Sequence, residues 1–296
     1  MRLDDEQESS NIEDRRGRGG GFRLPVGGGG GLQLGGGRMG LGTMAIVVIV
    51  ALFLGVNPLE LLGGGGVPQQ IGQPQPPQGQ PPANPSDGDR FVAKVLRTTE
   101  ETWGRLFPEQ LGRPYEEPKL VFFTGNVQSG CGAAESAMGP FYCPADKRVY
   151  LDQSFFDELS RRFGAPGDFA AAYVIGHEVG HHIQTILGIS AEVRQAQARA
   201  SKTESNALQV RMELQADCLA GVWGHDNKDI LEAGDVEEAM RAAQAIGDDT
   251  LQRAAGRSVV PESFTHGSAA QRSRWFRRGF DSGLIGSCDT FAARQL

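Results

Sequence analysis

A long uncharged stretch near the start of the chain limits what this protein can fold into. Residues 39–56 read MGLGTMAIVVIVALFLGV, and the next charged residue is Glu60. The uncharged residues 39–59 would span roughly 30 Å as a helix, which is the thickness of a bilayer core. We therefore expect a transmembrane signal anchor at residues 39–59. A buried core helix and a cleaved signal peptide are the alternatives, although the stretch starts late for a signal peptide and no A-x-A site follows closely.

The residues that flank this stretch predict its orientation. A cluster of arginines lies between residues 15 and 38, and neither Lys nor Arg follows the stretch until Arg90. The positive-inside bias then predicts a single-pass protein of the bacterial inner membrane, with a cytoplasmic N-terminus and an extracytoplasmic or periplasmic domain. Cysteine usage agrees, because an even set without a C-x-x-C pair indicates disulfides in an oxidising compartment. The four cysteines are Cys131, Cys143, Cys218 and Cys288.

Composition divides the chain into four parts. Residues 1–38 contain glycine runs and are expected to be a disordered cytoplasmic segment. The anchor at residues 39–59 is followed by a Gly/Pro/Gln-rich linker at residues 60–89. Residues 90–296 have ordinary globular composition and are long enough to bury a sizeable core. The formal net charge of -7 offers no basic stripe, so a nucleic acid partner is not expected, whereas the bilayer is.

Apolar periodicity in residues 90–296 predicts an α+β domain with a small sheet and a helical bundle. A helix is expected at residues 90–107, and strands are expected at residues 119–125 and 148–152. A disulfide between Cys131 and Cys143 would staple the loop between these strands. Helical patterning then dominates, at residues 169–187, 203–223, 236–246 and 269–280.

Three of the five histidines lie within the segment VIGHEVGHHIQ, residues 174–184. His177 and His181 are four residues apart, so they share one helical face and their Nε2 atoms can converge on one ion. HEVGH thus fits the H-E-x-x-H pattern, with two imidazole ligands for one catalytic Zn²⁺ and Glu178 as general base. The alternative is an exposed polar helix face without metal. His182 points elsewhere on the helix and is expected to be structural.

A catalytic zinc also needs a third protein ligand, which must come from another element. Glu213 and Asp217, in RMELQADCLAG, are four residues apart on a second predicted helix. One carboxylate can bind zinc while the other accepts the free N–H of a ligating histidine. A solvated helix face is the alternative interpretation of this pair. The remaining candidates for the third ligand are Glu192, Glu204, His225 and His266.

The spacing of Glu213 and Asp217 after H-E-x-x-H is similar to that of thermolysin-like gluzincin peptidases, and E-x-x-A-D resembles the membrane heat-shock and prenyl-protein metalloproteases. More closely, GPFYCPADKRVYLD, VIGHEVGHHIQTILGI, ELQADCLAGVW and FTHGSAAQRSRWFRRGFDSG resemble the bacterial putative neutral zinc metallopeptidase family, whose members carry one N-terminal anchor. The resemblance covers nearly the whole chain. It implies a zincin-like domain in which His177, His181 and Glu213 bind zinc and Glu178 is the catalytic base.

The C-terminal part offers further candidates. His266, in THGSAAQR, lies in a segment similar to T-H-P-x-x-x-x-R of the heat-shock membrane proteases, and its imidazole could donate to the oxyanion of the tetrahedral intermediate. The alternative is that it merely adjoins a helix N-cap at Thr265 or Ser268. A Cys218–Cys288 bridge would pin the C-terminal segment to the metal-bearing helix, with thiolate ligation of zinc as the competing idea. A solvated face is expected for Arg272, Arg274, Arg277 and Arg278.

These patterns predict a membrane-anchored zinc metallopeptidase that hydrolyses peptide bonds with metal-activated water and Glu178 as general base. An extended peptide substrate would add as an edge strand along residues 148–152. The alternative is a zinc-containing, non-catalytic binding or quality-control module of the cell envelope. Cleavage by the wild type but not by Glu178→Gln would distinguish the two.

Overall fold

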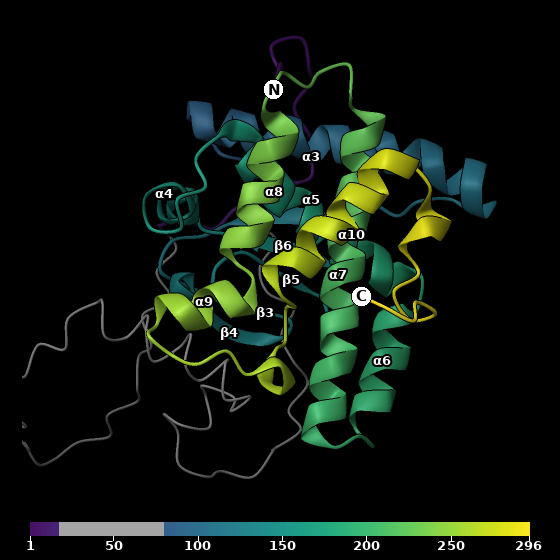
Figure 1. Ribbon diagram of the computed structural model, residues 1–296. Helices are drawn as coiled ribbons and strands as arrows, with labels where there is room; N and C mark the ends of the chain where they lie inside the picture. The colour runs from purple at the N-terminus through teal and green to yellow at the C-terminus, as the bar shows by residue number, and fades with distance from the viewer. Residues whose placement is uncertain (18–79) are drawn as a thin grey trace, which may run out of the picture.

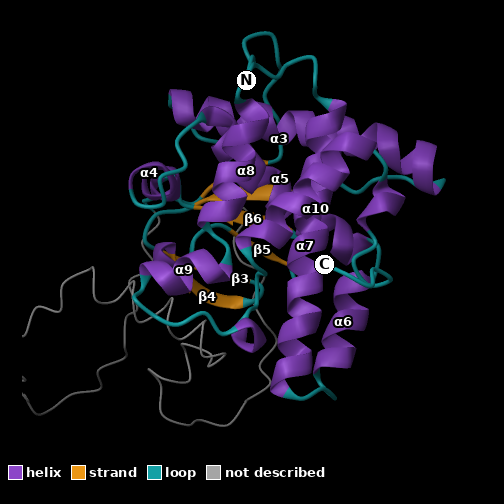
Figure 2. Cartoon of the chain, viewed as in Figure 1, coloured by secondary structure: helices purple, strands orange, loops and turns teal. Residues whose placement is uncertain are grey.

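The computed structural model describes residues 1–17 and 80–296, so the anchor expected at residues 39–59 lies outside the described residues. A search of the described part finds no helix that combines the length and the apolar character needed to cross a bilayer. Within this part, a small sheet lies behind a group of helices (Figure 2).

A mixed sheet of four strands, in the order β1-β2-β6-β5, forms one layer of the domain. β2 and β6 are parallel, with Leu120 opposite Val149, and β5 is antiparallel to β6. β2 and β6 have almost continuous apolar burial, as expected for strands covered on both faces. The strands are β1 (Ile12–Asp14), β2 (Lys119–Phe122), β5 (Phe141–Cys143) and β6 (Arg148–Leu151), and β3 (Asn126–Ser129) and β4 (Gly132–Glu135) form a separate hairpin.

The helices complete the core (Figure 1). α5 (Asp168–Ile186) is buried along most of its length and packs against α7 (Lys202–Asp226) and α8 (Asp235–Ala245). α3 (Asp87–Leu106) crosses behind the others, and α10 (Ala269–Ser282) packs extensively on α7. The shorter helices are α4 (Ser154–Arg161), α6 (Ile189–Gln197) and α9 (Asp248–Ala254), with single turns at Phe107–Leu111, Ser136–Met138, Pro261–Ser263 and Ile285–Cys288.

Two glycines allow α7 and α10 to touch. A Cβ atom at Gly221 would collide with the carbonyl oxygen of Phe276, and one at Gly279 would collide with the carbonyl oxygen of Cys218. The Cys218–Cys288 disulfide joins α7 to the turn that follows α10. The backbones therefore approach more closely than any residue with a side chain would permit.

The α+β class is confirmed, with the expected helices and strands shifted by a few residues at their ends. Strand β5, the hairpin and helices α4, α6 and α9 are additional elements. The first large helix begins at Asp87, where Ser86 caps it by accepting from the backbone N–H of Asp89. The boundary expected at residue 90 therefore lies too late, because residues 80–89 belong to the folded part.

Residues 1–17 also belong to the domain, so the expectation of a disordered segment over residues 1–38 is wrong for this part. β1 pairs in parallel with β2, and Arg16 lies 2.7 Å from Asp89. The backbone N–H of Asp14 donates to the carbonyl oxygen of Gln80 at 2.8 Å. Two segments that share one sheet lie on the same side of any membrane. This pairing therefore disagrees with the expected orientation, in which the N-terminus is cytoplasmic and the domain lies outside.

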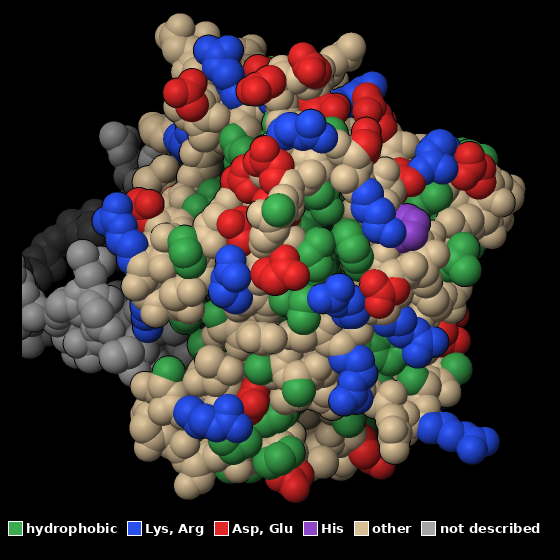
Figure 3. Space-filling model, turned by 45° about the horizontal axis from the view of Figure 1, so that its top comes forward, with side chains coloured by type: hydrophobic (Ala, Val, Ile, Leu, Met, Phe, Trp, Pro, Cys, Tyr) green, Lys and Arg blue, Asp and Glu red, His purple; other side chains and the backbone are tan. Residues whose placement is uncertain are grey.

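The visible surface carries charges of both signs. Acidic and basic side chains are interspersed over the face shown in Figure 3, with small apolar patches between them. Mixed charge of this kind agrees with the modest net charge of -7. It keeps a surface soluble without creating a large field of one sign.

Candidate metal centre

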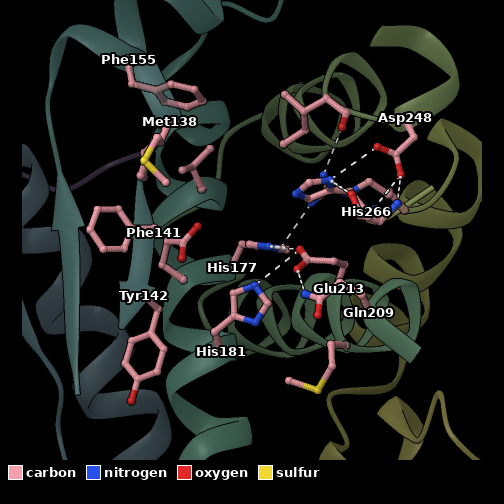
Figure 4. Close-up of a pocket in the computed structure, with 18 of the residues that line it drawn as sticks. Met138, Phe141, Tyr142, Phe155, His177, His181, Gln209, Glu213, Asp248 and His266 are labelled. Carbon is pink, nitrogen blue, oxygen red and sulfur yellow. Dashed lines mark hydrogen bonds and ion pairs between the residues drawn. The ribbon is translucent and has the colours of Figure 1, made fainter. Parts of the chain in front are cut away.

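α5 and α7 bring two histidines and one glutamate together (Figure 4). His177 and His181 are one turn apart on α5, and their Nε2 atoms lie 3.2 and 3.5 Å from the same oxygen, Oε2 of Glu213 on α7. The helices approach closely at this point because Gly180, inside the H-E-x-x-H segment, faces the backbone of Ala216. The structure thus brings together the three residues that the resemblance implies as zinc ligands.

The spacing of these donor atoms fits a tetrahedral zinc ion. With bonds of about 2.0–2.1 Å, two ligand atoms of such an ion lie about 3.4 Å apart. The distances of 3.2 and 3.5 Å between the imidazole nitrogens and Glu213 match this value. Two neutral imidazoles and one carboxylate are also a ligand set that zinc commonly takes, with room left for a fourth ligand.

A buried ionic network holds His177 in place. Its Nδ1 lies 2.8 Å from Oδ1 of Asp217, which also accepts from the Tyr173 hydroxyl at 2.5 Å. The guanidinium of Arg272 donates to both oxygens of Asp217 at 2.9 Å. Burial opposes ionisation of Asp217, but the charges of Arg272 and His177 outweigh it and lower the pKa of the carboxyl. The ionised Asp217 accepts the Nδ1 proton, which leaves Nε2 of His177 free to bind a metal.

The neutral amide of Gln184 accepts the Nδ1 proton of His181, as Asp217 does for His177. Nδ1 of His181 donates to Oε1 of Gln184 at 2.8 Å. The amide nitrogen of Gln184 donates to the carbonyl oxygen of Met212 at 2.7 Å, so its orientation is fixed. Gln184 was not among the sequence candidates. Its position three residues after His181 on the same helix is the signal that could have identified it.

The expectation of a solvated Arg272 is wrong. This side chain is buried, because Arg272 precedes Trp275 and Phe276 by three and four residues and shares their face of α10. That helical spacing is the signal that separates it from its neighbours. The exposed members of the arginine cluster are Arg274, Arg277 and Arg278.

Glu178 lines the same cleft as the three donor residues. It is buried, and this burial raises the pKa of its carboxyl although the charges of His181 and His177 oppose the rise. Gln209 lies across the cleft and donates to Oε1 of Glu213 at 2.9 Å. The surroundings of the two carboxyl groups therefore differ: Glu213 is held by hydrogen bonds, and Glu178 is buried without a side-chain partner among the described residues.

His266 also reaches the cleft. Its backbone N–H donates to Oδ2 of Asp248 at 2.6 Å, and its Nδ1 lies 3.0 Å from Oγ1 of Thr265. Burial opposes protonation of the ring, but the hydrogen bond that the ring donates to Asp248 and the charge of Glu213 outweigh it and raise the pKa of His266. Ser268 is the N-cap of α10, so His266 both adjoins a cap and lines the cleft.

His182 has the expected structural position. Its Nε2 donates to the carbonyl oxygen of Glu116 at 2.6 Å, and its Nδ1 accepts from the Tyr142 hydroxyl at 3.1 Å. Burial lowers the pKa of His182 to about 4, so the ring is neutral. The hydrogen bond to Tyr142 ties strand β5 to helix α5.

Both expected cysteine pairs are joined, Cys131 to Cys143 and Cys218 to Cys288. Because all four cysteines are bonded, the alternative of thiolate zinc ligation is wrong. Cys218 follows Asp217 on α7, so the second bridge ties the C-terminal segment to the helix that bears Glu213. Two such bridges are typical of an extracytoplasmic domain.

The donor group lies in a cleft of about 530 Å³. Figure 4 shows Met138, Phe141, Tyr142 and Phe155 along one side and Gln209, Glu213, Asp248 and His266 along the other, with His177 and His181 between them. The expected placement of a substrate along residues 148–152 is wrong, because β6 is paired on both edges. β5 is the outer strand at this end of the sheet, and its residues line the cleft.

Comparisons with known proteins agree with this geometry. A family model described as "Putative neutral zinc metallopeptidase" matches residues 1–291. The chain is 51% identical over 293 residues to "Uncharacterized protein YpfJ" of Escherichia coli strain K12, covering 98% of this chain and 99% of that protein. It is 40% identical over 228 residues to "Uncharacterized protein Rv2575" of Mycobacterium tuberculosis strain H37Rv, covering 71% and 74%. No solved structure matches the chain.

Proposed function

Because the chain belongs to the family described as "Putative neutral zinc metallopeptidase", we propose that it is a zincin-like peptidase that hydrolyses peptide bonds. The observation that supports this most strongly is the convergence of His177 and His181 on Glu213, in one cleft with Glu178. Hydrolysis by an activated water requires a general base beside the metal. The carboxyl of Glu178, which makes no bond to the three donor residues, is suited to that role.

His177, His181 and Glu213 would hold the ion, whose Lewis acidity would polarise a water molecule and the carbonyl of the scissile bond. Glu178 takes the proton of the attacking water and passes it to the leaving amine. Its place in the same cleft as the three donor residues supports both transfers. The protonated ring of His266 donates a hydrogen bond to the oxyanion of the tetrahedral intermediate.

The substrate is an extended peptide that lies in the cleft beside β5. The outer strand of a sheet offers unpaired backbone groups to a polypeptide, which supports this position over β6. The two disulfides support action outside the cytoplasm. Attachment to a bilayer through residues 39–59 stays a prediction.

The proposal is tested with the full-length chain by elemental analysis and by cleavage of a generic peptide library. We expect one zinc ion per chain, and cleavage that falls by a factor of about 10²–10⁴ in Glu178→Gln while zinc remains bound. Glu213→Ala is expected to lose zinc. Absence of stoichiometric metal, unchanged occupancy in Glu213→Ala, or equal cleavage by wild type and Glu178→Gln would each contradict it. Bound zinc without cleavage by either form would favour the non-catalytic module.

A further inference from the structure

One side of the cleft is apolar, and we call it the apolar wall. It comes from three separate parts of the chain: the turn before β5 together with β5 itself, helix α4 with the short segment that follows it, and the first half of α5. The residues of the wall are Met138, Pro140, Phe141, Phe155, Phe163 and Val174.

The wall is rigidly supported. The backbone bends at Gly139, where φ is +77°, and lies against the ring of Phe155, which a Cβ atom would approach to 3.3 Å. The Cys131–Cys143 disulfide holds one end of β5, and His182 holds Tyr142 in its middle. A surface fixed in this way keeps its shape when nothing covers it.

The wall is nevertheless partly uncovered. Met138 is 37% exposed, which is high for a large apolar side chain, and Phe141, Phe155 and Phe163 are half-buried. Among the described cleft residues between 137 and 163, only Glu158 carries a charge. The opposite side of the cleft presents Gln209, Asp248 and His266, beside further apolar residues such as Met212, Ile246 and Leu251 (Figure 4). The wall is therefore the side of the cleft with the fewest polar groups.

We propose that the apolar wall is a specificity site that binds one bulky apolar side chain of an extended polypeptide next to the bond that is cut. This inference rests on the proposed peptidase function and names its substrate class. Apolar rings accept an apolar side chain because contact removes both from water. They disfavour a charged one, which would lose its hydration without gaining a partner. The cleft volume of about 530 Å³ suits a few residues of extended chain.

The substrate class has a further property. Bulky apolar side chains are mostly buried in folded proteins. A polypeptide that offers one in an extended conformation is therefore unfolded, or is cut in a flexible segment. A secreted protein with several disulfides, supplied native and after reduction and carboxymethylation, tests this point, because both forms have the same sequence. We expect the unfolded form to be cut at least about tenfold faster, and equal rates would overturn it.

The specificity itself is tested with a peptide library and mass-spectrometric mapping of cleavage sites by the full-length zinc protein. Phe, Leu, Met and Tyr should exceed Asp, Glu and Ser about tenfold or more at one position beside the cut. Met138→Glu should reduce this ratio by about tenfold and favour Lys or Arg there. Leu111→Glu is the matched control, because Leu111 is also 37% exposed but does not line the cleft. It should leave the profile unchanged.

A second readout separates this inference from the proposed function. Binding of the same peptides to Glu178→Gln, measured by fluorescence anisotropy, needs no turnover. Apolar peptides should bind more tightly than charged ones, and adding Met138→Glu to this variant should abolish the difference. That result would support the wall even if no form cleaves peptides. A flat profile from an active wild type, or equal loss in Met138→Glu and Leu111→Glu, would overturn the wall and leave the peptidase function standing.

Discussion

The two sides of the cleft are built on different principles. The helical side, from α5, α7 and α10, places charged and polar groups in contact, so that His177, Asp217 and Arg272 each complete the bonding of another. The sheet side, from β5, α4 and Val174 of α5, presents rings and methyl groups that are held by a disulfide and by packing. Ion pairs and hydrogen bonds hold the side chains of the helical side, whereas packing and a disulfide hold those of the sheet side.

Substitutions on the two sides should therefore have different consequences. Removing a member of a buried ionic network leaves a partner without compensation, which costs stability. Removing part of an apolar surface leaves a smaller or rougher surface, which changes what fits there.

The largest effect is expected for Arg272→Met. This change leaves the buried carboxylate of Asp217 without its guanidinium partner, and loss of one member of such a pair costs about 3–5 kcal/mol. Urea unfolding of the full-length chain measures it. Arg274→Met on the exposed face of the same helix should cost less than about 1 kcal/mol. Similar losses of unfolding free energy in the two variants would show that the buried ion pair contributes no more than an exposed side chain.

The two disulfides allow a direct test of the two sides. Replacing Cys218 and Cys288 with serine opens a loop with a sequence separation of 70, and replacing Cys131 and Cys143 opens one of 12. Loop entropy then predicts losses of about 4 and about 3 kcal/mol. Zinc retention should drop only in the first variant, and peptide selectivity should weaken in the second. Full zinc retention with the Cys218–Cys288 bridge open would contradict this assignment.

Gln184→Leu tests the neutral hydrogen-bond partner on the helical side. It removes the acceptor for Nδ1–H of His181 while it keeps a side chain of similar size. Loss of such a partner typically lowers metal affinity by about 10–100-fold. Competition with a chelator measures the affinity. Gln252→Leu is the control, because Gln252 is also buried but bonds to Ser263 and Val260 and to neither histidine. An unchanged zinc affinity in Gln184→Leu would mean that packing alone orients His181.

The smallest effect is expected for Arg16→Gln, at the far end of the sheet from β5. Burial opposes ionisation of Asp89, but its hydrogen bond with Arg16 lowers the pKa of the carboxyl overall. Because the folded-state pKa is depressed, the stabilisation is present above about pH 4 and is lost as the pH falls through the lowered pKa. The variant should lose about 1 kcal/mol at pH 7 and less below pH 4. Hydrogen exchange of residues 1–17 at both pH values checks it.

Local periodicity accounts for what could be predicted from the sequence. The spacing of four residues places His177 beside His181 and Glu213 beside Asp217, since each pair lies on one helix. The density of arginines alone predicts an exposed Arg272. Its spacing of three residues from Trp275 instead predicts that both side chains lie on the buried face of the helix.

Other features have no local pattern. The apolar wall collects residues from three distant segments, and β1 is only three residues long. The pairing of β1 with β2 places Ile12 opposite Leu120. The sequence around Ile12 contains no pattern that predicts this pairing. Contacts of this kind arise from tertiary packing, so they become visible only in the structure.

Gly221 and Gly279 lie outside the cleft, yet they set the distance between the helices that carry Asp217 and Arg272. A methyl group at either glycine would collide with the backbone of the other helix and push α10 away from α7. The guanidinium would withdraw from its carboxylate, and the imidazole of His177 would lose its alignment. Alanine at these two positions should therefore disturb the candidate metal centre while every side chain of that centre remains present.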